Sequence, residues 1–131
     1  MISASHAPPA RNVAANRPAA NRPGHTRRVS AYASRERAKA EAFQHRYRGF
    51  ASYSDYATAI RDPRVDAVVI AVPPRFHLDL TLQALEAGKH VILEKPLVAS
   101  LAEVDALEAT VARTGRILMP IFQARFGNGL A

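Results

Sequence analysis

An α/β fold built on a doubly wound parallel sheet is predicted by two features of the 131-residue chain. Short runs rich in Val, Ile and Leu alternate with stretches of helical periodicity, and Pro, Gly or capping residues separate them. The most apolar run, 65–72 (VDAVVIAV), is nearly continuous and β-branched, as expected for a strand buried on both faces. The length allows one domain with a moderate core.

The expected elements follow one another at the spacing of such a sheet. Strands are expected at 29–33, 50–52, 65–72, 90–94 and 117–122, and helices at 35–46, 55–60, 76–87 and 101–114. Ser34 is expected to cap the first helix, and Gly88 follows the third. Ser100 and Glu103 form a capping box at the start of the fourth helix, which Gly115 ends.

The formal net charge of +7 is concentrated in the first part of the chain. Residues 1–48 carry ten Lys and Arg against two acids, whereas residues 49–131 carry eight against nine. Residues 1–28 contain five arginines, no acid and a tandem AANRP repeat, and we expect no stable structure from most of them. Such an opening also resembles a transit peptide, but its prolines argue against an amphipathic helix.

Composition argues against several classes of function. No apolar run approaches the roughly 20 residues that span a bilayer, so we expect a cytoplasmic protein without a membrane partner. The chain has no cysteine, which excludes disulfides, and its five histidines have no metal-ligand spacing, so no metal is assigned. Nucleic acid is the weakest alternative partner, because no aromatic side chain is interleaved with the arginines of residues 1–28.

Three groups of polar or rigid residues come directly after predicted strands. These groups are Ser34-Arg35, Pro73-Pro74 and Glu94-Lys95-Pro96. The carboxyl ends of parallel strands lie at one edge of a sheet, and ligands of such sheets bind outside that edge. We therefore expect the three groups on one rim, where a nucleotide would lie.

Lys95 is the strongest candidate among these residues for a binding or catalytic role. It stands between the carboxylate of Glu94 and the φ-restricted Pro96, which positions it more tightly than a surface lysine requires. A lysine held in this way can bind a ribose hydroxyl or assist a proton transfer. The alternative is a solvated lysine that merely follows a strand.

Three stretches together resemble the cofactor domain of a known family of enzymes. They are VSAYASRERAKAEAF, VDAVVIAVPPRFHLDLTLQALEAGKHVILEKPL and RILMPIFQARF, within about residues 29–128. The family is that of glucose–fructose oxidoreductase, inositol dehydrogenase and MocA (Gfo/Idh/MocA), and E-K-P after a buried strand is its most specific mark. The resemblance implies a Rossmann-type fold and NAD(P)-dependent oxidation or reduction of a sugar, polyol or related carbonyl.

The resemblance also implies which residues contact the cofactor. Family members place the E-K-P glutamate and lysine beside the nicotinamide ribose, here Glu94 and Lys95, and the lysine is often implicated in catalysis. The other implied cofactor contacts are Val72, Pro73 and Pro74 through their backbone, His77 at the same edge, Pro96, and Arg125 near the nicotinamide end. A histidine at a helix start is alternatively a capping or packing residue.

Ser34 and Arg35 favour NADP over NAD. An Asp or Glu after the second strand would accept hydrogen bonds from the ribose 2′-hydroxyl and repel a 2′-phosphate. The hydroxyl of Ser34 and the guanidinium of Arg35 instead suit a phosphate, through hydrogen bonding and charge. The alternative is that Ser34 only caps the helix and Arg35 is exposed.

The chain departs from the family pattern at both ends. It has no G-x-G-x-x-G turn after a first strand, so we expect an incomplete Rossmann-type sheet that lacks the central strand of the order 3-2-1-4-5-6. Its two neighbours would then have no partner, which predicts marginal stability and weak cofactor binding. We expect residues 29–124 to form a partial dinucleotide-binding domain and 125–131 to begin a substrate domain.

The sequence thus predicts the cofactor domain of an NAD(P)-dependent oxidoreductase, inactive by itself. A nucleotide-binding or partner-binding remnant without turnover is the alternative. The expected partners are a nicotinamide dinucleotide and, given a second domain, a small sugar or polyol. A homo-oligomer stays open for the full-length enzyme.

Overall fold

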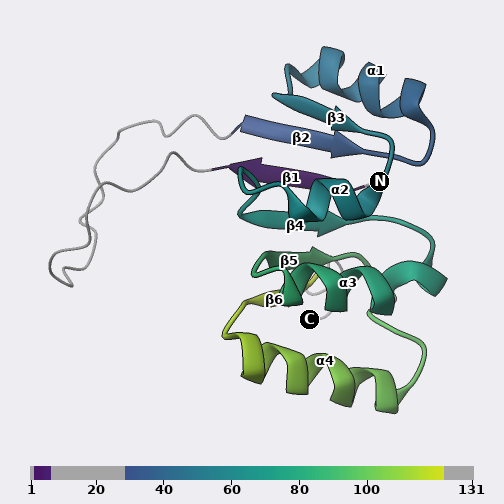
Figure 1. The fold of residues 1–131 in the computed structure, drawn as a ribbon. Coiled ribbons are helices and arrows are strands. Elements are labelled where there is room, and N and C mark those ends of the chain that lie inside the picture. The colour runs from purple at the N-terminus through teal and green to yellow at the C-terminus, as the bar shows by residue number, and fades with distance from the viewer. Residues whose placement is uncertain (1, 7–28, 123–131) are drawn as a thin grey trace, which may run out of the picture.

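The computed structural model describes residues 2–6 and 29–122, which form a six-stranded sheet in the order β3-β2-β1-β4-β5-β6 (Figure 1). The strands are β1 (Ile2–His6), β2 (Val29–Ala33), β3 (Ala51–Tyr53), β4 (Ala67–Ile70), β5 (His90–Leu93) and β6 (Leu118–Pro120). The helices are α1 (Arg37–Tyr47), α2 (Tyr56–Arg61), the 3₁₀ helix η1 (Pro74–Phe76), α3 (His77–Glu86) and α4 (Leu101–Thr114). The α/β class and the Rossmann-type strand order are confirmed.

The central position of the sheet is occupied by β1, which runs antiparallel to both of its neighbours. Ala4 lies opposite Ala31 of β2 and opposite Val68 of β4. The expectation that β2 and β4 lack a partner, and that the sheet begins only at residue 29, is therefore wrong for Ile2–His6. The physical reason is that two open strand edges present unpaired N–H and C=O groups, and an extended segment of either direction can satisfy them.

The direction of β1 decides what lies at each edge of the sheet. The other five strands run parallel to one another, so their carboxyl ends share one edge, and β1 begins at that edge with Ile2. It ends with His6 at the opposite edge, beside the start of β2. A parallel pair would need a crossover connection, usually a helix, whereas this antiparallel pair needs none. The parallel first strand and glycine-rich turn of the family are not found among the residues described.

The prediction that Ser34 caps the first helix is wrong, because the N-cap residue of α1 is Glu36, whose side chain makes no capping hydrogen bond. The hydroxyl of Ser34 accepts a hydrogen bond of 3.2 Å from the amide of Glu36, and Glu36 is the N-cap residue of α1. Because this turn comes first, α1 begins two residues later than predicted. The capping box of Ser100 and Glu103 is present at the start of α4, and Gly115 ends that helix with φ of 63°.

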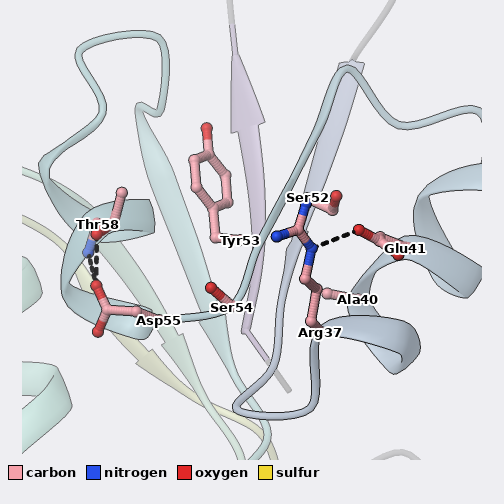
Figure 2. A pocket seen from close by; sticks show the side chains of 8 residues that line it. All are labelled: Arg37, Ala40, Glu41, Ser52, Tyr53, Ser54, Asp55 and Thr58. Atoms are coloured by element: carbon pink, nitrogen blue, oxygen red, sulfur yellow. Dashed lines mark hydrogen bonds and ion pairs between the residues drawn. The ribbon is translucent and has the colours of Figure 1, made fainter.

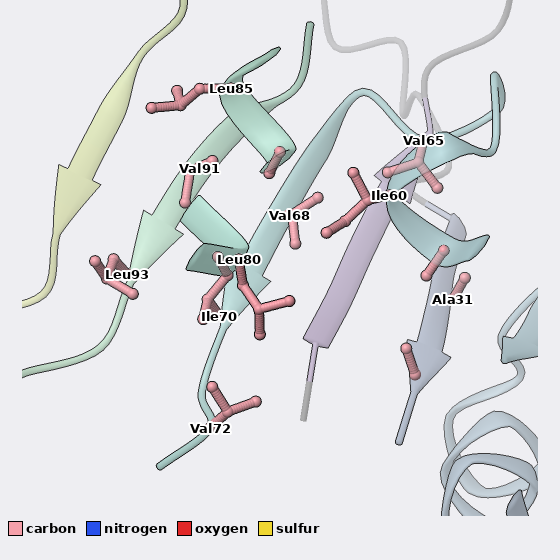
Figure 3. Close-up of a cluster of buried hydrophobic side chains, with 13 residues drawn as sticks. Ala31, Ile60, Val65, Val68, Ile70, Val72, Leu80, Leu85, Val91 and Leu93 are labelled. Carbon is pink, nitrogen blue, oxygen red and sulfur yellow. The ribbon is translucent and has the colours of Figure 1, made fainter. Parts of the chain in front are cut away.

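The hydrophobic core lies on the face of the sheet that α2 and α3 cover (Figure 3). In β4 the side chains of Val68 and Ile70 are 0% exposed, whereas Ala67 and Val69 are half-buried. The prediction that this strand is buried on both faces is therefore wrong for the part of the chain described here. No described helix covers the second face of β4, because α1 packs on β2 and β3 instead.

The alternation of side chains along β2 places α1 and α2 on opposite faces. Ala31 and Ala33 are buried in the core with residues of α2, so Tyr32 between them points to the other face. The ring centroid of Tyr32 lies 5.9 Å from those of both Phe43 and Tyr47 on α1. Helices on both faces of the β2–β3 half are the arrangement of a doubly wound sheet.

A polar cluster holds the end of α2 against β3. The Tyr53 hydroxyl donates to the Asp62 carboxylate, which also accepts a hydrogen bond of 2.7 Å from the Arg64 guanidinium. Partial burial, and then the bond to Asp62, raises the pKa of Tyr53 to about 12, and the bond from Arg64 holds the pKa of Asp62 well below its usual range. The buried ammonium of Lys89 donates to the carbonyls of Asp62 and Val65 at 2.9 and 2.6 Å. The cluster therefore connects α2, β3 and the residue that precedes β5.

Paired cysteines test the direction of β1, because the chain contains no cysteine of its own. Ser5 lies opposite Ala67, and Cα atoms of antiparallel neighbours are about 4.5–5.5 Å apart, which a disulfide can span. The double variant Ser5→Cys/Ala67→Cys should therefore form a disulfide under mild oxidation, detected by mass spectrometry of a proteolytic digest.

The matched control is Ser5→Cys/Val69→Cys, which requires the opposite strand direction. Diagonal neighbours of this kind are about 7–8 Å apart, so little cross-linking is expected. Efficient cross-linking of the control pair and none of the first pair would show that β1 runs parallel to β4.

Candidate functional site

The three groups that the sequence predicted on one rim do lie along the carboxyl edge of the sheet (Figure 1). They are Ser34-Arg35 after β2, Pro73-Pro74 after β4 and Glu94-Lys95-Pro96 after β5. Backbone hydrogen bonds of the sheet continue into the first residue after β2 and after β5. The Ser34 amide donates to the Tyr53 carbonyl at 3.1 Å, and the Glu94 amide donates to the Ile70 carbonyl at 3.0 Å. The segments are therefore held by the sheet and do not lie in long loops.

His77 connects the segments that follow β4 and β5. Its side chain is 1% exposed, with Nδ1 at 2.7 Å from the carbonyl oxygen of Pro96 and Nε2 at 2.8 Å from that of Val72. A carbonyl oxygen only accepts, so both contacts are hydrogen bonds at once when both ring nitrogens carry a proton. Both ring nitrogens thus face the backbone of the two segments. These contacts favour a positioning role, and a direct cofactor contact by His77 stays a prediction.

The Glu94-Lys95-Pro96 segment directly follows β5, with Glu94 half-buried and Lys95 and Pro96 exposed. The Lys95–Pro96 peptide bond is cis, and the carboxylate of Glu94 accepts a hydrogen bond of 3.2 Å from the Lys95 amide. Lys95 itself is exposed, and within residues 2–6 and 29–122 no carboxylate lies within ion-pair distance of its ammonium. The positive charge of Lys95 is therefore available to a ligand.

A hollow of about 260 Å³ lies between the turn after β4 and the segment after β5. Its lining residues are Pro74, Arg75, Leu78, Pro96, Val98, Ala99 and Glu103. The structure thus brings together Pro74 and Pro96, which the sequence predicted at one site. Arg75 was missed, although a base directly after two prolines was a visible signal.

Two arginines converge on one aromatic ring at the same edge. The Cζ atom of Arg35 lies 5.0 Å from the centroid of the Phe76 ring, and that of Arg75 lies 4.5 Å from it. Beside them, Ser34 is 7% exposed, and its hydroxyl accepts from the Glu36 amide while keeping its own proton to donate. The end of β2 and the turn after β4 therefore meet where Arg35 contacts the Phe76 ring.

A second hollow, of about 270 Å³, lies where α1 and α2 begin, beside β3 (Figure 2). The Arg37 guanidinium donates to the Glu41 carboxylate at 2.7 Å, and the Asp55 carboxylate accepts from the Thr58 amide. The bond to Glu41 raises the pKa of Arg37, and the bonds from Thr58 lower the pKa of Asp55. Because its charged groups already have partners, we assign no ligand to this hollow.

The remaining predicted residue, Arg125, lies outside the described residues. Among those residues, no three His, Asp or Glu side chains are grouped so that they could hold a metal ion. No helix in the described ranges has the length and apolar character needed to cross a bilayer.

The fold and the edge together define a class of protein. In doubly wound sheets the ligand lies outside the carboxyl ends of the strands, where the strand order reverses, and here that reversal falls between β1 and β4. The rigid proline turn, the unpaired lysine and the two arginines all lie at that edge. This arrangement is that of a nucleotide-binding α/β domain. The chain belongs to the Gfo/Idh/MocA oxidoreductase family, since the model of that family, described as an NAD-binding Rossmann fold, matches residues 5–122.

Individual relatives agree with this assignment. An uncharacterized oxidoreductase of Rhizobium meliloti is 40% identical over 88 residues, which are 67% of this chain and 26% of the relative. The scyllo-inositol 2-dehydrogenase (NAD(+)) of Bacillus subtilis is 42% identical over 72 residues, 55% of this chain and 21% of the relative. The chain thus spans about a quarter of the length of these relatives.

Solved structures of the family have the same fold. The crystal structure of KijD10, a 3-ketoreductase from Actinomadura kijaniata in complex with NADP and TDP-benzene, matches with a TM-score of 0.69 and 32% identity. The match covers 74% of this chain and 30% of that structure.

The positioning role of His77 predicts a loss of stability when the ring is removed. His77→Leu removes the ring contacts to both carbonyls and leaves the Val72 carbonyl unpaired in a buried setting, at a cost of about 1–3 kcal/mol in the free energy of unfolding. Urea unfolding measures this loss, and faster hydrogen exchange of the Lys95 amide should accompany it. The matched control is His45→Leu on the exposed surface of α1, expected within about 0.5 kcal/mol of wild type. Equal stability of the two variants would show that the His77 contacts do not hold the segments.

Proposed function

We propose that this chain is the nucleotide-binding part of a cytoplasmic, NADP-dependent oxidoreductase that acts on a sugar, a polyol or a related carbonyl compound. The observation that carries the proposal is the unpaired Lys95 ammonium on a segment that His77 connects to the Val72–Pro74 turn. Relatives in the family are named as a dehydrogenase of an inositol and as a ketoreductase, which supports the substrate class.

Each residue of the edge has a role in this proposal. A bound nicotinamide supplies the hydride chemistry, and the protein supplies binding and orientation. Lys95 donates hydrogen bonds to the ribose next to the nicotinamide and can pass a proton to or from the substrate oxygen. Glu94 and Pro96 fix the course of the chain around Lys95, and Val72–Pro74 approach the cofactor through backbone. Arg125 is proposed near the nicotinamide end on the family resemblance alone.

The preference for NADP rests on the chemistry of Ser34 and Arg35. No carboxylate stands directly after β2 to accept a hydrogen bond from a 2′-hydroxyl and to repel a 2′-phosphate. One relative is named for NAD(+) and one solved structure of the family contains NADP, so the family includes both. The hydroxyl and the guanidinium favour the phosphorylated cofactor.

The described part of the chain has no helix N-terminus directly after β1 at which the pyrophosphate of the dinucleotide could bind. Family members seat it on a helix that follows the first strand, but here β1 begins at the binding edge, and no described helix follows it there. We therefore propose weak dinucleotide binding and no turnover by these 131 residues alone, because substrate contacts would come from outside the part that the chain shares with its relatives. The second candidate is a nucleotide-binding remnant without turnover in any context.

Titration with NADPH and NADH tests the proposal. The chain should bind NADPH more tightly than NADH, measured by the fluorescence of the reduced nicotinamide. Lys95→Met should weaken NADPH binding by about tenfold, since a charge-assisted hydrogen bond is worth about 1.5–3 kcal/mol and 1.4 kcal/mol is tenfold.

Arg116→Met is the matched control, because Arg116 is exposed and precedes β6 at the opposite edge of the sheet. It should bind NADPH as wild type does. Absence of binding of both dinucleotides would contradict the proposed function. Turnover of a polyol or aldose by the chain alone would contradict its inactivity.

A further inference from the structure

We infer that Arg75 is a specificity-determining residue, which binds the 2′-phosphate of NADP together with Arg35 beside the Phe76 ring. This inference rests on the proposed function and deepens it, because it names the group that separates NADP from NAD. Arg75 lies in η1 after β4. It belongs to neither Ser34-Arg35 nor E-K-P, two motifs from which the sequence predicted cofactor contacts.

The geometry brings two arginines from separate segments to one place. Arg35 follows β2 and Arg75 follows β4, and β1 lies between these two strands. The carboxyl ends of β2 and β4 are therefore about 10 Å apart. Both guanidiniums nevertheless lie on Phe76, with Cζ atoms at 5.0 and 4.5 Å from the ring centroid. The half-buried ring thus orients two long side chains that would otherwise be free to turn into solvent.

The charges at this place are not balanced within the described part of the chain. Arg37, Arg64 and Arg113 each pair with a carboxylate there, whereas neither Arg35 nor Arg75 lies within ion-pair distance of one. Two like charges on one ring repel each other, and an anion between them would remove that repulsion. A phosphomonoester carries nearly two negative charges and three acceptor oxygens, which two guanidinium forks can bind from two sides.

A purely local explanation would be that Arg75 stacks on Phe76 because the two residues are adjacent in the chain. Arg46 and Tyr47 form such a local pair, with the Arg46 Cζ atom 5.4 Å from the ring centroid. That pair lies at the end of α1, at the opposite edge of the sheet, shortly before β3 begins. Arg46 therefore gives a control with the same local stacking but no second guanidinium.

The experiment uses fragments that probe only the adenosine half of the cofactor. Binding of adenosine 2′,5′-bisphosphate and of 5′-AMP to the full chain is measured by calorimetry for wild type, Arg75→Ala, Arg75→Lys, Arg35→Ala and Arg46→Ala. Arg75→Ala and Arg35→Ala should each weaken binding of the bisphosphate by about tenfold and change 5′-AMP binding by less than about twofold. Arg75→Lys keeps the charge but not the forked guanidinium, so its affinity for the bisphosphate should lie between those of wild type and Arg75→Ala. Arg46→Ala should bind the bisphosphate as wild type does.

The possible outcomes separate this inference from the proposed function. If Arg75→Ala weakens both fragments equally, or neither of them, the inference is overturned while nucleotide binding stands. If wild type binds 5′-AMP and the bisphosphate with equal affinity, the edge does not recognise a 2′-phosphate, and the inference also fails. If wild type binds neither fragment and neither dinucleotide, the proposed function fails and the inference falls with it.

Discussion

The pairing of β1 with β2 on one side and β4 on the other holds the two halves of the sheet together. Strands β2 and β3 carry Ser34 and Arg35, whereas β4 and β5 carry the proline turn and Lys95. Among the described strands, β1 is the one that pairs with both halves of the sheet. If β1 left the sheet, four rows of backbone groups would lose their partners and two apolar edges would be exposed. The relative position of Arg35 and Arg75 depends on this one strand, and so does any preference for a phosphorylated cofactor.

Much of the fold was predictable, because local sequence and tertiary structure agree in residues 29–122. The strand 29–33, the capping box of Ser100 and Glu103, and the helix end at Gly115 follow from alternation and capping chemistry alone. The role of Ile2–His6 was not predictable in the same way. Five residues have no helical or strand period strong enough to decide, and their place follows from the open edges of β2 and β4, which are distant in sequence. The half-buried Val69 was missed because an apolar run cannot reveal which helices are present to cover it.

The candidate site was predictable where a motif ends a strand and not where a contact joins two segments. Lys95 and the prolines follow from their position after buried strands, and the structure places them on one edge. The bonds of His77 to the carbonyls of Val72 and Pro96, and the meeting of Arg35 and Arg75 on Phe76, depend on how the turns after β2, β4 and β5 approach one another. Such contacts are set by the sheet and have no signal in any single stretch of sequence.

Mapping of NADP⁺ onto the chain by NMR chemical-shift changes is the most direct test of this account. The account predicts that the largest changes fall on the amides of Ser34 and Arg35, of Arg75 to His77, and of Glu94 and Lys95, all at the carboxyl edge of the sheet. The amides around the hollow between α1 and α2 should change little. Changes confined to that hollow or to the opposite edge, or no changes at millimolar NADP⁺, would contradict the claim that this edge is a nucleotide-binding site.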